Sequence, residues 1–329
     1  STPSNSSAAS DVYKRQQVVN TMFSKKLLIP LLSLSLLVTP AYSSHAAENA
    51  EAAGTSVEGQ GMLSPSSSSE SSESVFNGSG AGTSSEPVTD EKLETILKQV
   101  QSQLPAENGT WAVFISDLVN GTEGSLNDQK MQAASLIKLY IMGAVYENYD
   151  QITGQYGRDS VDSNLYSMIT VSDNDAANTL TTYLGGGDSA AGMQAVNSFC
   201  QAHGYDQTHM GRMLLASNEN DDNYTSVGDC GHLLQEIYKQ DTSGYTHAAD
   251  MFNLLKAQTR CNKIPAQLPE GVKTANKTGE LDNVENDAGI IYDSKNDVVI
   301  VFMSQNLSSA GSAQNTIATL SRTIYDYYN

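Results

Sequence analysis

Residues 168–178 of this 329-residue chain read MITVSDNDAAN. An apolar segment leads into the triplet Ser172-Asp173-Asn174, and two alanines follow in a stretch that favours helix. Serine and aspartate are common helix caps, so the triplet alone is usually a cap or a turn. The same serine hydroxyl is suited to relay a proton to a leaving nitrogen, and the Asn174 amide is suited to hold a substrate amide. Motifs elsewhere in the chain decide between these interpretations.

A second motif, Ser135-Leu136-Ile137-Lys138, opens an apolar segment that is predicted to be helical to about Tyr146. Helical spacing puts Ser135 and Lys138 on one face, one turn apart. Serine needs a neighbouring base to become a nucleophile, and a buried lysine beside another cation can lose its proton and act as that base. On its own, such a spacing is usually a pair of side chains on the surface of a helix.

A third motif, Lys277-Thr278-Gly279-Glu280, precedes two predicted strands. Lysine and threonine at this point are suited to bind a substrate carboxylate, and Gly279 allows another segment of backbone to approach closely. Alone, the motif is typical of a loop that enters a strand. The joint occurrence of S-x-x-K, S-D-N and K-T-G in this order is far more specific than any one of them.

On these motifs, residues 89–329 resemble a class A β-lactamase-type serine hydrolase of the β-lactamase and penicillin-binding protein superfamily. Residues 110–138 are similar to the hairpin and nucleophile helix of that family, and residues 258–279 are similar to the approach to its third motif. The resemblance implies a two-lobed α/β fold and the opening of a β-lactam amide through an acyl-enzyme on a serine. Ser135 would be the acylated nucleophile, Lys138 its proton acceptor, and Ser172 the shuttle that carries the proton to the leaving nitrogen.

The resemblance also implies the residues that bind the substrate, which are Asn174, Lys277, Thr278, Gly279 and Glu280. Asn174 would hold the side-chain amide of the substrate. Lys277 and Thr278 would bind its carboxylate and keep the local field positive. The backbone N–H groups of Ser135 and Glu280 would form the oxyanion hole, whose donors each contribute roughly a hundredfold or more to the rate.

Two features of the cleft depart from the family pattern. Ser172 follows Ser135 by only 37 positions, which is short for the family and predicts a more open cleft. The sequence also shows no obvious arginine near the closing strands that would help to bind a carboxylate.

The residue that releases the acyl group also departs from the pattern. The family carries a glutamate on an omega-shaped loop, with an asparagine four residues later, and that glutamate activates the attacking water. If Arg212 matches the arginine of this loop, the glutamate position falls on Leu214, which cannot act as a base, and Asn218 matches the asparagine. We favour this register. The alternative is a shortened loop in which Glu219 is the deacylation base and Asn223 supplies the four-residue spacing.

The sequence leaves three functions open. The first is a β-lactamase that hydrolyses its acyl-enzyme, and the second is a penicillin-binding or D-Ala-D-Ala peptidase-like enzyme with slow deacylation. The missing glutamate and the open cleft motivate the second. The third is a non-enzymatic sensor or cell-wall-binding protein, although no binding role requires the whole set of motif residues. A Ser-His-Asp hydrolase is disfavoured because the chain has no G-x-S-x-G elbow.

The pattern of elements predicts the architecture independently of the motifs. Apolar residues at helical spacing predict a helix over 93–104, and strands are expected over 111–118, 287–292 and 298–303, with a last helix around 317–324. An antiparallel sheet built from both ends of the domain, flanked by terminal helices, is therefore expected. The α/β lobe would comprise 89–134 and 258–329, and a central all-helical lobe would comprise 135–257, with the site in the cleft between the lobes.

The first part of the chain is expected to lie outside the folded domain. Residues 22–47 have the basic, apolar and small-residue order of a secretory signal peptide, and the apolar run is short for a membrane span. Residues 1–21 are interpreted as a non-native leader. Residues 48–88 are rich in Ser, Gly and Glu and predict a disordered tether. The mature protein is therefore expected to be exported, without a membrane span.

Composition limits the partners. The net charge of −19 argues against nucleic acid, which requires a basic face, and leaves a β-lactam or peptidoglycan-like small substrate. No spacing of histidines or cysteines indicates a metal site, and nothing indicates an organic cofactor. Cys200, Cys230 and Cys261 allow three possible disulfides or three free, buried thiols. The sequence does not indicate an oligomeric state.

Overall fold

The computed structural model of the protein describes residues 90–329. The expected leader, signal peptide and tether lie outside this range. None of the helices within it is long and apolar enough to cross a membrane.

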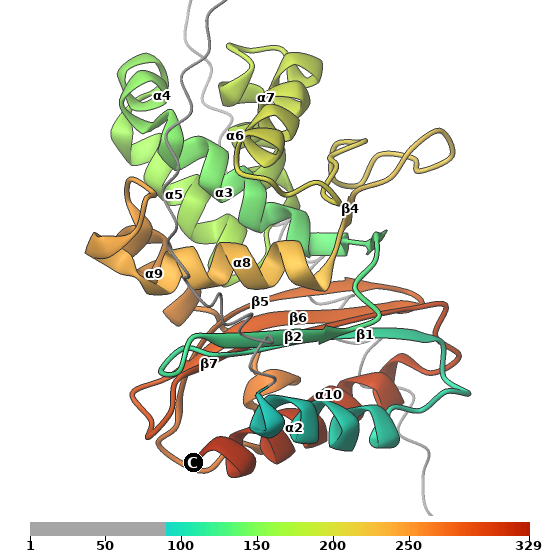
Figure 1. The fold of residues 1–329 in the computed structure, drawn as a ribbon. Coiled ribbons are helices and arrows are strands. Elements are labelled where there is room, and N and C mark those ends of the chain that lie inside the picture. Colours follow the sequence, from blue (N-terminus) through green and yellow to red (C-terminus); the bar gives the residue numbers. More distant parts are fainter. Residues whose placement is uncertain (1–89) are drawn as a thin grey trace, which may run out of the picture. The chain divides into compact units, whose positions relative to one another are not determined.

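A five-stranded antiparallel sheet forms the centre of the domain, in the order β2-β1-β7-β6-β5 (Figure 1). Its strands are β1 (Thr110–Asp117), β2 (Thr122–Leu126), β5 (Lys273–Leu281), β6 (Val284–Tyr292) and β7 (Val298–Gln305). The first strand pairs with the last, so that Trp111 lies opposite Ser304. The sheet is therefore completed only by segments from both ends of the domain, as the sequence predicts.

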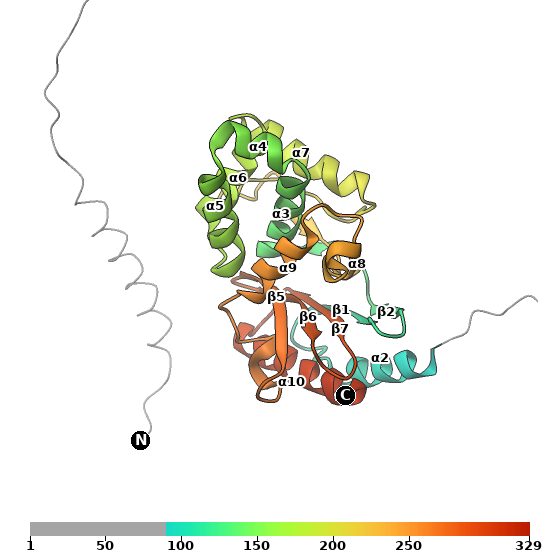
Figure 2. The ribbon, with the colours of Figure 1, turned by 90° about the vertical axis from the view of Figure 1, so that its left-hand side faces the viewer.

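Helices cover both faces of the sheet (Figure 2). One face packs against α2 (Glu91–Gln103) and α10 (Ala310–Tyr328), and the other packs against α8 (Val227–Tyr238) of the helical lobe. Alternate residues of a strand point to opposite faces, and both faces are apolar. In β1, Val113 packs toward the terminal helices, whereas Phe114 packs toward the helical lobe.

The helical lobe is arranged around α3, which is buried along almost its whole length. This lobe contains α3 (Ile137–Glu147), α4 (Tyr149–Tyr156), α5 (Arg158–Thr170), α6 (Asn174–Leu184), α7 (Ser189–Ala202), α8, η2 (Gln240–Thr242) and α9 (Ala248–Lys256). The short helical turn η1 (Ala134–Leu136) packs against β5 and leads into α3, and the turn η3 (Ile264–Gln267) packs against α10 on the opposite face of the sheet. A helix that is apolar on all sides forms the centre of a lobe because every face must be covered.

The two-lobed α/β fold is confirmed, and the structure corrects three details. The helical lobe is not entirely helical, because β4 (Tyr224–Thr225) pairs with β3 (Met131–Gln132) from the other lobe. The third motif is not a loop before the closing strands but part of the edge strand β5. Among the cysteines, all three are free, and Cys261 is exposed rather than buried, while the other two are buried.

Candidate active site

Ser135 lies in the turn η1, which leads directly into α3. Ala134, immediately before it, has a φ of +48°, in the left-handed region that residues other than glycine adopt uncommonly. The turn is held at the Ala133 carbonyl, which accepts the Leu136 N–H at 3.0 Å and Asn286 Nδ2 at 3.2 Å. These bonds fix the serine at the N-terminal end of the central helix and tie that end to β6.

Lys138 lies one turn further along, and its side chain is fully buried. Its Nζ atom lies 3.0 Å from Ser135 Oγ, as the S-x-x-K spacing predicts. The same Nζ atom lies 2.7 Å from the Ser172 carbonyl oxygen and 2.7 Å from Asn174 Oδ1. The fold therefore brings the first two motifs together around one amine.

The neutral form of Lys138 fits this environment. Burial lowers the pKa of Lys138 to about 7, against the opposing effect of the Asp173 carboxylate. A neutral amine has two N–H donors and one lone pair. The Ser172 carbonyl oxygen and Asn174 Oδ1, each 2.7 Å from Lys138 Nζ, can only accept hydrogen bonds. They therefore occupy both N–H donors of the neutral amine. The lone pair is then left for the Ser135 hydroxyl, which is the arrangement that a general base requires.

Ser172 lies between two lysines. Its Oγ atom is 3.1 Å from Lys138 Nζ and 2.9 Å from Lys277 Nζ. Its backbone φ of +62° is a left-handed conformation of a kind that costs roughly 1–3 kcal/mol and is found at functional sites. The next residue, Asp173, accepts the Ala176 N–H at 2.8 Å and caps α6. The cap that the sequence suggests is thus present, and it aims the serine into the cleft.

Lys277 and Thr278 lie in the edge strand β5, and both are buried. Lys277 Nζ donates to Ser172 Oγ and, at 2.6 Å, to the carbonyl oxygen of Thr278. Burial lowers the pKa of Lys277 well below its usual range, and the nearby Lys138 adds to this effect. A continuous chain of polar contacts therefore runs from Ser135 through Lys138 and Ser172 to the third motif.

Gly279 allows β5 to approach the nucleophile. A Cβ atom at this position would lie 2.9 Å from the Ala133 carbonyl oxygen and 3.2 Å from the Ser135 backbone nitrogen. The lack of a side chain at Gly279 therefore permits the contact, and the backbone at Gly279-Glu280 lies alongside the Ser135 amide. The two amides assigned to the oxyanion hole belong to these adjoining segments.

An arginine lies beside Glu280, although the sequence shows no obvious arginine near the closing strands. Arg260 Nη1, from the loop after α9, donates to Glu280 Oε2 at 2.7 Å, and Lys263 Nζ lies 3.2 Å from Glu280 Oε1. Burial by itself raises the pKa of Glu280, but these two cations outweigh it and lower the pKa below its usual value. Arg260 also helps to lower the pKa of Lys138 and Lys277. Arg260 was not predicted as a site residue because it lies close to Glu280 in space but well before β5 in sequence.

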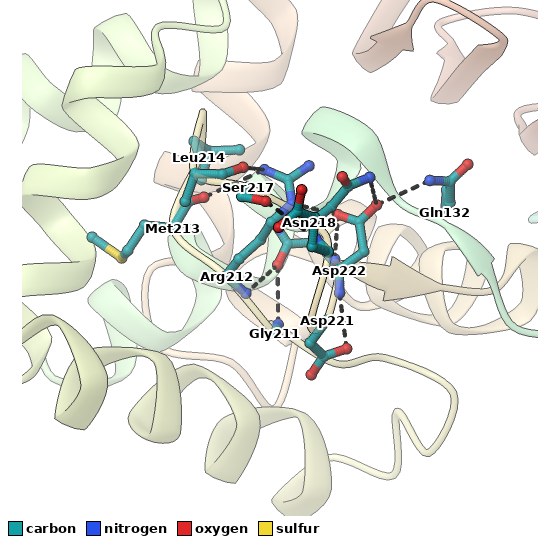
Figure 3. A network of polar contacts seen from close by, with 12 residues as sticks. Gln132, Gly211, Arg212, Met213, Leu214, Ser217, Asn218, Asp221 and Asp222 are labelled. Atoms are coloured by element: carbon teal, nitrogen blue, oxygen red, sulfur yellow. Dashed lines mark hydrogen bonds and ion pairs between the residues drawn. The ribbon is translucent and has the colours of Figure 1, made fainter.

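The loop between Gly211 and Asn223, whose polar contacts are drawn in Figure 3, contributes several of the residues that line the cavity around Ser135. The Leu214 N–H donates to Asn178 Oδ1 at 2.8 Å, and Asn178 Nδ2 donates to the Leu214 carbonyl at 3.0 Å. Asn178 had no predicted role, although it lies one helical turn after Asn174 and so on the same face of α6. These contacts fix the backbone of the loop at Leu214.

An ion pair stabilises the same loop (Figure 3). Arg212 Nε donates to Asp222 Oδ1 at 2.7 Å, and Gln132 Nε2 donates to Asp222 Oδ2 at 2.9 Å. Burial opposes ionisation of Asp222, but these donors lower its pKa below the usual value. The N–H groups of Gly211 and Arg212 both donate to Asn223 Oδ1, at 3.1 and 3.2 Å. Asn223 therefore joins the two ends of the loop.

Glu219 is an exposed residue of this loop, and its backbone N–H donates to Ser217 Oγ at 3.3 Å. It is not among the residues that line the cavity around Ser135, whereas Asn218 is. The structure thus places Asn218, and not Glu219, at the wall of the site.

The resulting cavity has a volume of about 290 Å³. It is lined by Ala134, Ser135, Asn174, Arg212, Leu214, Leu215, Ala216, Asn218, Glu280 and Leu281. The one carboxylate among these lining residues belongs to Glu280, and it is already paired with Arg260 and Lys263. Within residues 90–329, no cluster of histidine, cysteine, aspartate and glutamate side chains is suited to hold a metal ion.

The two-lobed fold and the cluster of two serines and two lysines define a serine hydrolase of the β-lactamase and penicillin-binding protein superfamily. A family model described as the Beta-lactamase enzyme family matches residues 92–159 and 155–328, and the chain belongs to that family. No curated protein matches the chain in sequence.

Solved structures share the fold at low sequence identity. PBP-A is 22% identical, with a TM-score of 0.62, and the match covers 71% of this chain and 96% of PBP-A. A β-lactamase from Sphaerobacter thermophilus is 22% identical, with a TM-score of 0.59, and the match covers 70% of this chain and 96% of that one. A variant of PBP-A in which a leucine is replaced by glutamate, described as an acyl-enzyme complex with penicillin G, is 23% identical, with a TM-score of 0.61 and coverage of 71% and 96%.

Proposed function

We propose that this protein is a serine enzyme that β-lactams acylate at Ser135 and that releases the acyl group slowly, as a penicillin-binding type of enzyme. The observation that carries the proposal is the position of Lys138 Nζ, 3.0 Å from Ser135 Oγ, in surroundings that favour the neutral amine. Slow release is supported by Leu214, which lines the same cavity and, in the register that keeps Arg212 and Asn218, takes the place of the glutamate of the family.

Acylation follows from the contacts. Ser135 Oγ attacks the carbonyl carbon of the lactam amide and gives its proton to Lys138 Nζ. The N–H groups of Ser135 and Glu280 stabilise the oxygen anion that forms. When the C–N bond breaks, the hydroxyl of Ser172 gives its proton to the leaving nitrogen. Ser172 Oγ is then reprotonated from Lys138 Nζ, 3.1 Å away, so the proton taken from the nucleophile reaches the leaving group.

Substrate binding uses the remaining motif residues. The Asn174 side chain faces the cavity and is suited to hold a side-chain amide, although its Oδ1 atom also accepts from Lys138. The substrate carboxylate lies near Thr278 and Lys277, within the positive field of Arg260. These features suit a β-lactam or an acyl-D-alanyl peptide of the peptidoglycan type. The signal-like segment 22–47 supports export of the protein to a place where both would be met.

A hydrolytic β-lactamase is the second candidate, and the family match favours it. Rapid hydrolysis requires a base that activates water beside the acyl carbonyl. The carboxylate of Glu280 is held by two cations and is not available as that base. Glu219 would therefore have to move from its exposed position to provide it.

The test is to follow the intact mass of the purified protein over time with a penicillin, together with Ser135→Ala. We expect an adduct of one penicillin that persists in the parent and is absent in the variant. An adduct that disappears while hydrolysed penicillin accumulates would establish the β-lactamase instead. No adduct in the parent, together with no D-alanine released from a D-alanyl-D-alanine peptide, would leave a non-enzymatic binding protein.

A further inference from the structure

Lys263 is a fully buried lysine outside the three motifs. It lies just before η3, and its Nζ atom contacts Glu285 Oε2 at 2.7 Å, Glu280 Oε1 at 3.2 Å and the carbonyl oxygen of Gly279 at 3.3 Å. The third contact joins a buried ammonium group to the backbone of β5 at the point where that strand meets the nucleophile.

The surroundings hold this ammonium group in place. Gln314 Nε2, from α10, donates to Glu285 Oε1 at 2.8 Å, so both oxygens of that carboxylate are engaged. The backbone next to the lysine is also fixed, because the Ile264 N–H donates to Asp287 Oδ2 at 2.9 Å. Removing two opposite charges from water costs free energy that their attraction often only offsets, so a pair such as Lys263 and Glu285 is weak evidence of a stabilising role. A role beyond stability should therefore be sought in its other contacts.

The contact with Gly279 bears on the oxyanion hole. The carbonyl of Gly279 and the N–H of Glu280 belong to one planar peptide unit. A cation that binds the carbonyl oxygen draws electron density through that unit and makes its N–H a stronger donor, because hydrogen bonds in series polarise one another. The same contact limits rotation of the peptide plane, so the N–H keeps its direction.

We propose that Lys263 is a positioning residue that orients and polarises the Gly279–Glu280 peptide, whose N–H is an oxyanion donor. The inference rests on the proposed function in one respect, since an oxyanion forms only if Ser135 is acylated. Lys263 does not touch the substrate. Its charge acts through the backbone, and the Glu280 carboxylate on the same residue is a second tie between the ammonium group and that peptide.

The test compares the parent with the double variant Lys263→Met/Glu285→Gln, which removes both charges of the pair and leaves no unpaired charge at position 285. We expect acylation by penicillin to become about tenfold slower, a fraction of the loss on removing a whole oxyanion donor. Infrared difference spectra of the acyl-enzyme should show the ester carbonyl stretch at a higher wavenumber, because a weaker donor polarises the carbonyl less. Lys263→Arg, which keeps the positive charge, should retain most of the acylation rate of the parent.

The matched control is Lys273→Met/Asp293→Asn. This pair is exposed, and Lys273 is a lysine of the same strand that binds a carboxylate at 2.6 Å. The control should change neither the acylation rate nor the ester stretch. An unchanged ester stretch and rate in the folded Lys263→Met/Glu285→Gln variant would overturn the proposal.

A second measurement does not depend on acylation. The amide proton of Glu280 in the free protein should move upfield in the nuclear magnetic resonance spectrum of the double variant. Glu285→Gln alone leaves the ammonium group less neutralised and should move the same proton downfield. If the parent forms no adduct, the proposed function fails, while these two shifts still decide whether Lys263 polarises the peptide. Equal or absent shifts in both variants would contradict it.

Discussion

Asn178 binds both backbone polar groups of Leu214, accepting its N–H at 2.8 Å and donating to its carbonyl at 3.0 Å. The Leu214 side chain is thereby fixed at the wall of the cavity that contains Ser135. A side chain of a different kind at this position would be directed by the same two hydrogen bonds. A carboxylate introduced at this position would therefore be held at the same wall of the cavity.

Leu214→Glu should accelerate release of the acyl group, because a carboxylate at this place can activate water next to the ester. General-base catalysis usually contributes about a hundredfold or more, and we expect an acceleration of that order. The rate of loss of the penicillin adduct, measured by intact mass, checks this. Leu215→Glu is the matched control, because the Leu215 side chain is 76% exposed and its backbone is not held by Asn178. Equal acceleration by both variants would show that a fixed position is unnecessary.

The acylation rate should depend on pH through Lys138. Its pKa is about 7, and only the neutral amine can accept the Ser135 proton. The rate should therefore rise about tenfold per pH unit below pH 7 and become constant above about pH 8. Stopped-flow measurement of acylation across this range tests the expectation. A rate that is the same at about pH 5.5 and about pH 8.5 would exclude Lys138 as the base.

Arg260→Gln should weaken reaction with substrates that carry a carboxylate. A charge-assisted hydrogen bond contributes about 1.5–3 kcal/mol, so the second-order acylation constant for a penicillin should fall about tenfold or more. The methyl ester of the same penicillin should be little affected. The midpoint of the acylation profile should also move to higher pH, because Arg260 helps to lower the pKa of Lys138. Arg322→Gln, an exposed arginine that pairs with Asp326 on α10, should change none of these values.

Asp287 should make stability depend on pH. Burial raises the pKa of this carboxyl from its ordinary value of 3.8 to about 6, against the opposing effect of Lys263. The folded protein therefore binds this proton more tightly than the unfolded chain, and the stability contributed by the neutral carboxyl is lost as the pH rises from about 4 to about 6. Asp287→Asn cannot ionise, so its Tm relative to the parent should be higher at pH 7 than at pH 4, by about 5 °C. Thermal unfolding at the two pH values measures this, and a constant difference in Tm would count against it.

The sequence predicts the parts of this molecule that depend on local pattern. The continuous apolar runs of β1 and β7 indicate strands that are covered on both faces, and the helical spacing in α2 indicates its helix. The S-x-x-K spacing predicts the contact between Ser135 and Lys138 because one helical turn sets it. The strand β5 was missed, since its residues Lys273–Leu281 are mostly polar and are buried by the site itself rather than by an apolar core.

Contacts between distant segments could not be predicted from local pattern. Arg260 reaches Glu280 because the loop after α9 folds back over the edge of the sheet, and Lys263 reaches Gly279 in the same way. Neither arginine nor lysine carries a local signal that distinguishes such a position from the protein surface. The left-handed backbone conformation of Ser172 was not predicted either, because no local pattern in the sequence indicates it.

The pairing of β1 with β7 sets the order in which this protein can mature. During synthesis, the nucleophile helix leaves the ribosome long before its partners in β5, and the sheet that supports both cannot close until β7 has followed. Contacts so distant in sequence form slowly, and the waiting chain exposes the apolar faces that the sheet will later bury. The active site therefore forms only after β7 has been synthesised. A chain truncated before β7 contains every motif residue but not the site that they form.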